Sequence, residues 1–450
     1  MLKLLMRRAE IPAEREAAFV SLISALSDRW KPLVRPLRES QAGILGASSS
    51  PLNWGAEHTE DLFSSRRTEL IDGEVFVFDS ALVVMTVARN TRGARVKFVP
   101  TSDGGLERVL DESAELILRV SVVSVSEENA TEYLDEIGAL CLEHFEIAPV
   151  DFHYKNSSFD ALRSEALIEE VPSEEKYVAA SLVLSDAHAR STAIAIKSSR
   201  GLLKADALKR VPVDPEQAPN VLDALHTAGI ISTEMVVVCG TSGNQVARLD
   251  DDAANLDALS NLGLRCACGK PINEEVAQEL YSVSPMGIVL LNKSRWMSVL
   301  VRDRLQALGV PNHYILLECQ LGSDEIDCIA LISGELTIFE LKDKEFSIGN
   351  AYSFGAKMGI TSPSHAVIVT TDSVSEDVKS HFSRTQAGEE RRVSSNSHQI
   401  HYVEGGEFLK QLDTFVSSVF EKDAQVILDD VLKLATARAS SVVGALKARA

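Results

Sequence analysis

The sequence predicts a multidomain α/β protein, on the basis of its length, its composition and the alternation of helical and strand patterns along it. The chain has 450 residues, of which 45% are hydrophobic and 24% are charged, as is typical of folded globular proteins. A chain of this length is expected to form roughly two to four domains. Amphipathic helical patterns alternate with runs of β-branched residues. We therefore expect several modules, each combining helices and strands.

Residues 1–170 predict an N-terminal α+β module. Helical periodicity covers residues 11–30, and a second helix is expected at residues 127–145, with Ser126 as its N-cap. Three apolar runs are expected to form strands of one sheet: residues 73–88, 94–99 and 115–125. The module contains no recognisable catalytic motif, so the sequence suggests no chemistry for it.

Residues 171–284 predict a central module of two helices followed by a hairpin. The helices are expected at residues 202–210 and 215–230, with Gly229 as a stop signal, and the hairpin at residues 233–249. This order resembles a winged helix. In DNA-reading winged helices the second helix offers basic and amide groups to the groove, but residues 215–230 contain no Lys or Arg. The sequence therefore favours packing or protein binding over DNA reading for this module.

Three cysteines of the central module, Cys239, Cys266 and Cys268, raise the question of a zinc site. A structural zinc site needs four ligands, usually supplied by paired cysteines and histidines. No fourth Cys or His lies nearby in the sequence. Ordinary thiols are thus the favoured interpretation, with zinc binding left open.

The net charge of −20 excludes a broad, nonspecific electrostatic surface for nucleic acid. Any nucleic-acid contact must therefore be local. Six scattered cysteines do not suggest a disulfide framework, and the first residues lack the apolar core of a signal peptide. The longest apolar stretches, such as residues 115–125, are too short to cross a membrane. We expect a cytoplasmic protein without membrane contact.

Residues 285–405 predict a C-terminal αβββαβ core. A helix at residues 294–308 ends near Gly309, and the order strand, strand, strand, helix, strand follows between residues 313 and 372. Residues 406–450 are expected to form C-terminal helices that pack against the rest of the protein or oligomerise.

A two-residue turn at Ser333 and Gly334 fixes the register of the second and third strands of this core. Glycine tolerates the positive φ that such a turn requires. The register places Asp327 directly opposite Glu340, with Cβ atoms about 5 Å apart. Because side chains alternate along a strand, Lys342 lies on the same face as Glu340. The sequence therefore predicts that three charged groups converge on two otherwise apolar strands.

The paired carboxylates of Asp327 and Glu340 predict a divalent-cation site. Like charges at close range repel in a buried environment, and a bound cation removes that cost. Mg²⁺, or Mn²⁺ in its place, prefers one or two carboxylates together with water and phosphate oxygens. Lys342 would then orient an attacking water and stabilise charge on a phosphate. Glu318 on the preceding strand is a third candidate acid, because a turn at residues 321–324 would place it opposite Asp327, whereas a shift of one residue would turn it to the other face.

The acid on one strand followed by Glu-x-Lys on the next, within an αβββαβ core, resembles the PD-(D/E)XK nuclease superfamily, also called restriction-endonuclease-like. The resemblance covers residues 285–405. It implies that Asp327, Glu340 and the carbonyl of Leu341 bind the metal, and that Lys342 assists the attacking water. The residue before Asp327 is Ile326 rather than the proline of the motif, a departure that many members share.

The resemblance implies a metal-dependent endonuclease, with DNA as the favoured substrate and RNA as the alternative. A role in bacterial defence or restriction would suit such a protein. The acidic surface favours a protein partner or a homo-oligomer that helps to deliver the substrate. The other interpretation is a noncatalytic adaptor, in which a degenerate nuclease domain and the winged-helix-like module bind proteins.

Overall fold

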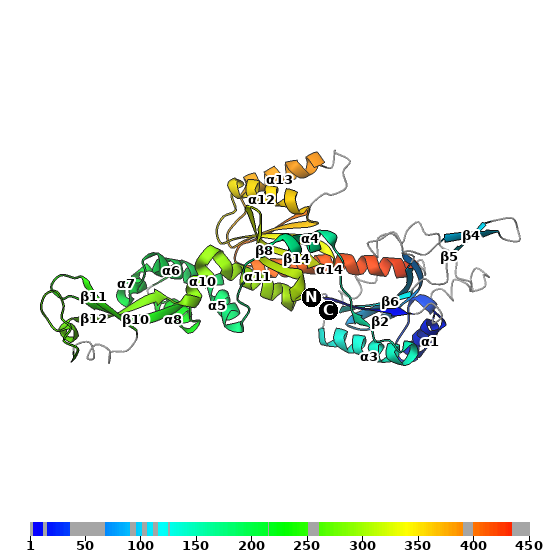
Figure 1. Ribbon diagram of the computed structural model, residues 1–450, viewed down its shortest axis with the longest axis horizontal. Coiled ribbons are helices and arrows are strands. Elements are labelled where there is room, and N and C mark those ends of the chain that lie inside the picture. Colours follow the sequence, from blue (N-terminus) through cyan, green and yellow to red (C-terminus); the bar gives the residue numbers. More distant parts are fainter. Residues whose placement is uncertain are drawn as a thin grey trace. The chain divides into compact units, whose positions relative to one another are not determined.

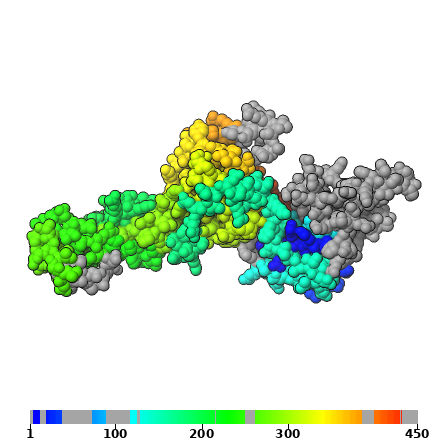
Figure 2. All heavy atoms as spheres, viewed as in Figure 1, coloured from blue at the N-terminus to red at the C-terminus, as the bar shows by residue number. Residues whose placement is uncertain are grey.

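The computed structural model describes residues 3–11, 16–36, 68–90, 96–100, 106–110, 116–124, 127–214, 216–250, 261–389 and 399–433, which are the coloured parts of Figure 1. Figure 2 shows the heavy atoms of the chain as spheres in the same view. The chain forms two compact units. The first comprises residues 1–155, 332–334 and 414–450, and the second comprises residues 156–331 and 335–413. Each is described separately below.

The first unit contains a five-stranded antiparallel sheet in the order β2-β3-β6-β1-β7. Apolar side chains of the two main helices pack with alternate residues of the strands in one core. The half-buried Tyr154 donates a hydrogen bond to Asp423 of the C-terminal helix at 2.5 Å, so this part of the helix joins the unit. The elements are β1 (Lys3–Ile11), α1 (Glu16–Ser27), β2 (Thr68–Val77), β3 (Ala81–Asn90), β4 (Val96–Pro100), β5 (Leu106–Leu110), β6 (Leu116–Ser124), α3 (Glu127–Phe145) and β7 (Val150–Asp151).

One expectation for this unit is wrong, and one strand was not expected. The predicted strand at residues 94–99 corresponds to β4, which pairs with β5 in a separate two-stranded sheet. The place beside β6 is taken instead by β1, which the sequence did not predict, while the helix expected within residues 11–30 is α1. Arg7 and Arg8 interrupt the apolar pattern of β1. Arg7 ion-pairs with Asp135 at 2.9 Å, so the charges that hide the strand in the sequence have partners in the fold.

The central part of the second unit has a small antiparallel sheet in the order β11-β10-β12-β9. The expected helices are α7 and α8, the expected hairpin is β10 and β11, and Gly229 has the positive φ of 71° that ends the helix. The strand β12, which pairs along all of β10, was not expected. The elements are α4 (Ser157–Glu165), β8 (Leu167–Ile168), α5 (Glu175–Ser185), α6 (Ala187–Ser198), β9 (Leu202–Leu203), α7 (Lys204–Arg210), α8 (Ala218–Thr227), β10 (Ile231–Val238), β11 (Gln245–Asp250) and β12 (Val276–Val283).

The rest of the second unit contains a six-stranded mixed sheet in the order β17-β16-β15-β14-β13-β8. Strands β13 and β14 are antiparallel, whereas β15, β16 and β17 are parallel. Figure 1 shows α12 and α13 beside one another in this unit, and they are in contact. The elements are α10 (Pro285–Leu291), α11 (Arg295–Ala307), β13 (Ile315–Leu321), β14 (Asp324–Ile332), β15 (Glu335–Lys342), α12 (Ile348–Thr361), β16 (His365–Thr370), α13 (Glu376–Glu389) and β17 (Gln399–Glu404). The helix α14 (Phe408–Lys433) begins in this unit, and its residues from 414 onward belong to the first unit.

The order α11-β13-β14-β15-α12-β16 is therefore the observed order of this region. Ser333 and Gly334 have φ of 49° and 77°, the pair of positive values that a two-residue type I′ turn requires. Ser347 begins α12 in a capping box with Asn350. The helix ends at Thr361, because Ser362 takes the left-handed conformation, with φ 47°.

The ends of the predicted modules differ from those of the two units. Residues 156–170, grouped with the N-terminal module on sequence, lie in the second unit, where β8 pairs with β13. Of the predicted C-terminal helices, α14 is described and residues 434–450 lie outside the described part of the chain. Among the described helices, none combines the length and the apolar character that crossing a membrane requires.

Candidate active site

The side chains of Asp327, Glu340 and Lys342 meet at the centre of the six-stranded sheet, as the hairpin register predicts. Asp327 projects from β14, and the other two project from its neighbour β15. The ammonium Nζ of Lys342 lies 2.9 Å from Glu340 Oε1 and 3.6 Å from Asp327 Oδ2. A single lysine therefore bridges two carboxylates across adjacent strands.

A second lysine reaches the same cluster from α12. The Nζ of Lys357 lies 2.6 Å from Glu340 Oε2, and both side chains are almost completely buried. The backbone N–H of Leu341 donates to Asp327 Oδ2 at 2.6 Å, so this residue contacts the cluster through its amide. Two carboxylates and two ammonium groups thus form one compact network, which we call the charged cluster (Asp327, Glu340, Lys342 and Lys357).

The charged cluster is closed on one side and partly open on the other. The side chain of Glu340 is 4% exposed and that of Lys357 is 8% exposed. By contrast, Asp327 is 17% exposed and Lys342 is 25% exposed. A ligand arriving from solvent would therefore meet Asp327 and Lys342 first, while Lys357 holds Glu340 from the interior.

Burial and charge repulsion both disfavour the ionised form of Asp327. Burial raises its pKa from 3.8 to about 7, and the neighbouring charge of Glu340 acts in the same direction, against the opposing effect of Lys342. For Lys342, burial lowers the pKa, but the carboxylates of Asp327 and Glu340 outweigh burial and raise it overall. The cluster therefore holds a lysine that stays charged beside an acid that is costly to ionise.

The raised pKa of Asp327 predicts a stability that depends on pH. Between about pH 4 and pH 7 the folded protein keeps a proton that the unfolded chain releases, so the free energy of unfolding falls as pH rises through this range. Asp327→Asn should remove this dependence, which amounts to at most about 1.4 kcal/mol per pH unit. Urea denaturation at pH 5, 6, 7 and 8 measures it. Asp324→Asn, on the same strand, should show the same pH dependence as wild type. If the free energy of unfolding changed with pH in the same way in all three proteins, Asp327 would not be the source of the dependence.

Glu318 lies opposite Asp327 by register but points its carboxylate elsewhere. The pairs Leu317 with Cys328 and Cys319 with Ile326 flank it on either side. Glu318 itself has a left-handed φ of 48°, and its Oε1 accepts a hydrogen bond from Ser298 of α11 at 2.5 Å. Burial raises its pKa, partly offset by the hydroxyl of Ser298. The structure thus brings the predicted third acid beside the charged cluster without including it.

Glu318→Gln should therefore change Mg²⁺ affinity by less than about twofold, because an amide oxygen can still accept the hydrogen bond from Ser298. Calorimetric titration of Mg²⁺ into the two proteins measures the difference. A tenfold or larger loss of affinity would instead make Glu318 a metal ligand.

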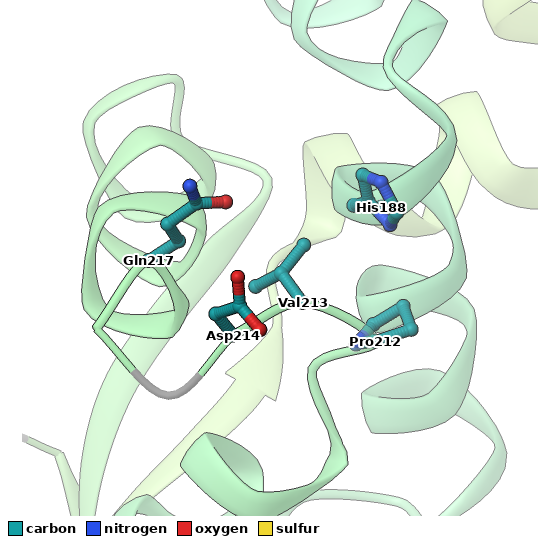
Figure 3. Close-up of a pocket in the computed structure, with 5 residues that line it drawn as sticks. All are labelled: His188, Pro212, Val213, Asp214 and Gln217. Carbon is teal, nitrogen blue, oxygen red and sulfur yellow. The ribbon is translucent and has the colours of Figure 1, made fainter.

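An open hollow in the central module is the other notable surface feature. His188 borders it on α6, Gln217 borders it at the start of α8, and Pro212, Val213 and Asp214 lie in the loop between α7 and α8 (Figure 3). One acid and one histidine on an open surface do not make a metal or nucleophile site. We assign no chemistry to this hollow.

The comparisons with known proteins do not identify a family for this chain. No family model matches the sequence, and no curated protein matches it. Among solved structures, the crystal structure of protein VC1899 from Vibrio cholerae is similar at 14% sequence identity with a TM-score of 0.32. The match covers 60% of this chain and spans 58% of the length of that one.

Proposed function

We propose that this protein is a metal-dependent nuclease whose active site is the charged cluster. The observation that carries the proposal is the meeting of Asp327, Glu340 and Lys342 on adjacent strands of an αβββαβ unit. Apart from acidic residues at the partly exposed starts of the two strands, these three charged groups interrupt segments that are otherwise buried and mostly apolar. Such an arrangement is costly to maintain and is typical of functional sites.

The residues present suit a divalent cation. Asp327 and Glu340 offer carboxylate oxygens, the ligands that Mg²⁺ and Mn²⁺ prefer. Burial and the neighbouring charge of Glu340 both raise the pKa of Asp327, so its ionised form is costly without a cation beside it. When bound, the cation would neutralise these acids and polarise a phosphate oxygen of the substrate.

The two lysines have separate tasks in this proposal. Lys342, at the partly open side, is placed to orient an attacking water and to stabilise negative charge on the phosphate. Lys357, buried behind Glu340, is a positioning residue that holds the carboxylate in one orientation. Hydrolysis of a phosphodiester bond would then occur at the face formed by Asp327 and Lys342.

DNA is the proposed substrate, with RNA as the alternative, and both follow from the resemblance of this core to the PD-(D/E)XK nucleases. The net charge of −20 favours local contact with the nucleic acid and delivery by a protein partner or a second copy of the chain. The same resemblance also supports a role in bacterial defence or restriction.

One observation favours a noncatalytic adaptor as the second candidate. Each carboxylate oxygen of Glu340 already has a lysine partner, at 2.9 Å and 2.6 Å. The charged cluster can therefore satisfy its charges without a metal ion. In this case it would stabilise a scaffold domain that binds proteins.

Cleavage assays with the full-length chain separate the two candidates. Supercoiled plasmid, single-stranded DNA and single-stranded RNA are each incubated with Mg²⁺, Mn²⁺ or EDTA, with and without the product of any neighbouring gene. The nuclease proposal expects cleavage that requires a divalent cation. Absence of both cleavage and calorimetric Mg²⁺ binding in a well-folded protein would favour the adaptor.

A further inference from the structure

Three cysteines and a glutamate meet at one end of the small central sheet. The candidate ligand atoms of Cys239, Cys266, Cys268 and Glu275 all lie within 4.8 Å of one another. The side chains of three of them are buried, and Cys268 is exposed. All the cysteines are free. We call this group the thiol cluster (Cys239, Cys266, Cys268 and Glu275).

The register of the sheet explains why Glu275 joins cysteines that are distant in sequence. Val238 and Val276 are the last pair of the antiparallel ladder between β10 and β12. The next position on each strand is therefore Cys239 and Glu275, facing one another across the end of the ladder. A sequence search limited to Cys and His misses this fourth ligand.

The backbone shapes two turns that present the cysteines. After Cys239, the N–H of Gly243 donates to the Cys239 carbonyl at 2.8 Å. After Cys266, the N–H of Gly269 donates to the Cys266 carbonyl, also at 2.8 Å. Gly243 and Gly269 have φ of 71° and 92°, values that favour glycine. Each cysteine therefore begins a tight hydrogen-bonded turn, and the two turns bring Cys239 and Cys266 close together.

Hydrogen bonds from the backbone orient two of the four ligands. The N–H of Gly240 donates to Glu275 Oε2 at 2.7 Å, and the N–H of Ser242 donates to Cys239 Sγ at 3.4 Å. Support of this kind from groups behind the ligands is typical of metal sites. The Sγ of Cys268 lies 2.9 Å from Glu275 Oε1, so neither described partner of this buried carboxylate is a cation. Buried carboxylates usually have a positive partner or a metal.

The composition and spacing of the thiol cluster suit Zn²⁺. Thiolates are soft ligands that select zinc over Mg²⁺ or Ca²⁺. Zinc bonds of about 2.3 Å to sulfur in a tetrahedron give ligand separations of about 3.8 Å. Ligand atoms within 4.8 Å of one another need to approach by only about 1 Å to close such a shell. Four protein ligands would leave no open position, as in structural rather than catalytic zinc sites.

We propose that Cys239, Cys266, Cys268 and Glu275 bind one structural Zn²⁺ ion that ties together the end of β10, the start of β12 and the turn at residues 266–270. The site belongs to the central module and is independent of the proposed nuclease. It would fix the tip of the four-stranded sheet, where β10 and β12 end their pairing.

Metal analysis of the full-length protein tests the site. Protein purified under reducing conditions should contain about one zinc ion per chain. In Cys239→Ser and in Cys266→Ser the zinc content should fall to near none, whereas Cys141→Ala, which removes a buried thiol of α3, should keep it. Replacement by Co²⁺ should produce thiolate-to-cobalt charge-transfer bands and the visible spectrum of a tetrahedral site.

Glu275 is tested separately because it is the least usual ligand. Glu275→Gln should weaken zinc binding by about tenfold or more in competition with a chromogenic chelator. Glu274→Gln, its exposed neighbour, should leave zinc binding unchanged. Equal affinity of Glu275→Gln and wild type would remove Glu275 from the site. Wild-type protein that lacks zinc and takes up none under reducing conditions, or that forms a disulfide within the thiol cluster instead, would overturn the proposal without needing any variant to fold.

Discussion

Asp327→Asn should abolish both active-site Mg²⁺ binding and cleavage while leaving the protein as stable as wild type or more stable. The substitution removes one of two carboxylate ligands, and the single carboxylate that remains does not compete well with water for Mg²⁺. It also removes the cost of ionising Asp327, whose pKa burial first and the charge of Glu340 second raise to about 7. The amide oxygen can still accept the hydrogen bond from the Leu341 N–H. Mg²⁺ titration, plasmid cleavage and a melting curve, each at pH 8, measure the three effects.

Glu340 requires a paired variant to test the same metal site. Glu340→Gln alone leaves the ammonium of Lys357 buried without its carboxylate, and an uncompensated buried charge costs about 3–5 kcal/mol. The double variant Glu340→Gln with Lys357→Met removes both members of the pair. We expect it to melt at a higher temperature than the single variant and to lack Mg²⁺ binding. Asp324→Asn, on β14, is the matched control. Cleavage at the wild-type rate by the folded double variant, or by Asp327→Asn, would contradict the nuclease proposal.

The convergence of the charged cluster could be predicted because it depends only on local geometry. A two-residue turn with glycine fixes the pairing of Asp327 with Glu340, and strand alternation then places Lys342. Lys357 could not be placed in the same way. Its contact with Glu340 depends on how α12 packs across the sheet, and helix packing is not specified by sequence spacing alone.

Three other features depended on information that is not local. The left-handed backbone at Glu318 is uncommon for a residue other than glycine, and no sequence pattern signals it. The place of Glu275 beside the cysteines depends on the long connection between β11 and β12. Strand β1 was missed because Arg7 and Arg8 disrupt its apolar pattern, and the ion-pair partners of Arg7, Asp135 and Asp151, lie in distant parts of the chain. Local rules therefore placed hairpins well and placed long-range partners poorly.

Lys342→Ala should separate metal binding from catalysis. Lys342 is not a metal ligand in the proposed site, and both carboxylates remain, so Mg²⁺ should still bind. Cleavage should fall by about 10²-fold or more, because the group that orients the water and stabilises phosphate charge is lost. Glu340 keeps its second partner, Lys357, so the fold should survive.

Lys344→Ala provides the matched control for this prediction, because Lys344 is an exposed lysine two residues further along the chain. It should cleave at the wild-type rate. Single-turnover cleavage at saturating Mg²⁺ and calorimetric titration with Mg²⁺ measure rate and affinity separately. Cleavage at the wild-type rate by folded Lys342→Ala protein would refute the role assigned to the lysine. If Lys342→Ala unfolded while Lys344→Ala stayed folded, Lys342 would instead belong to a structural ion network. The main role of its ammonium group would then be to stabilise the charged cluster rather than to bind a phosphate.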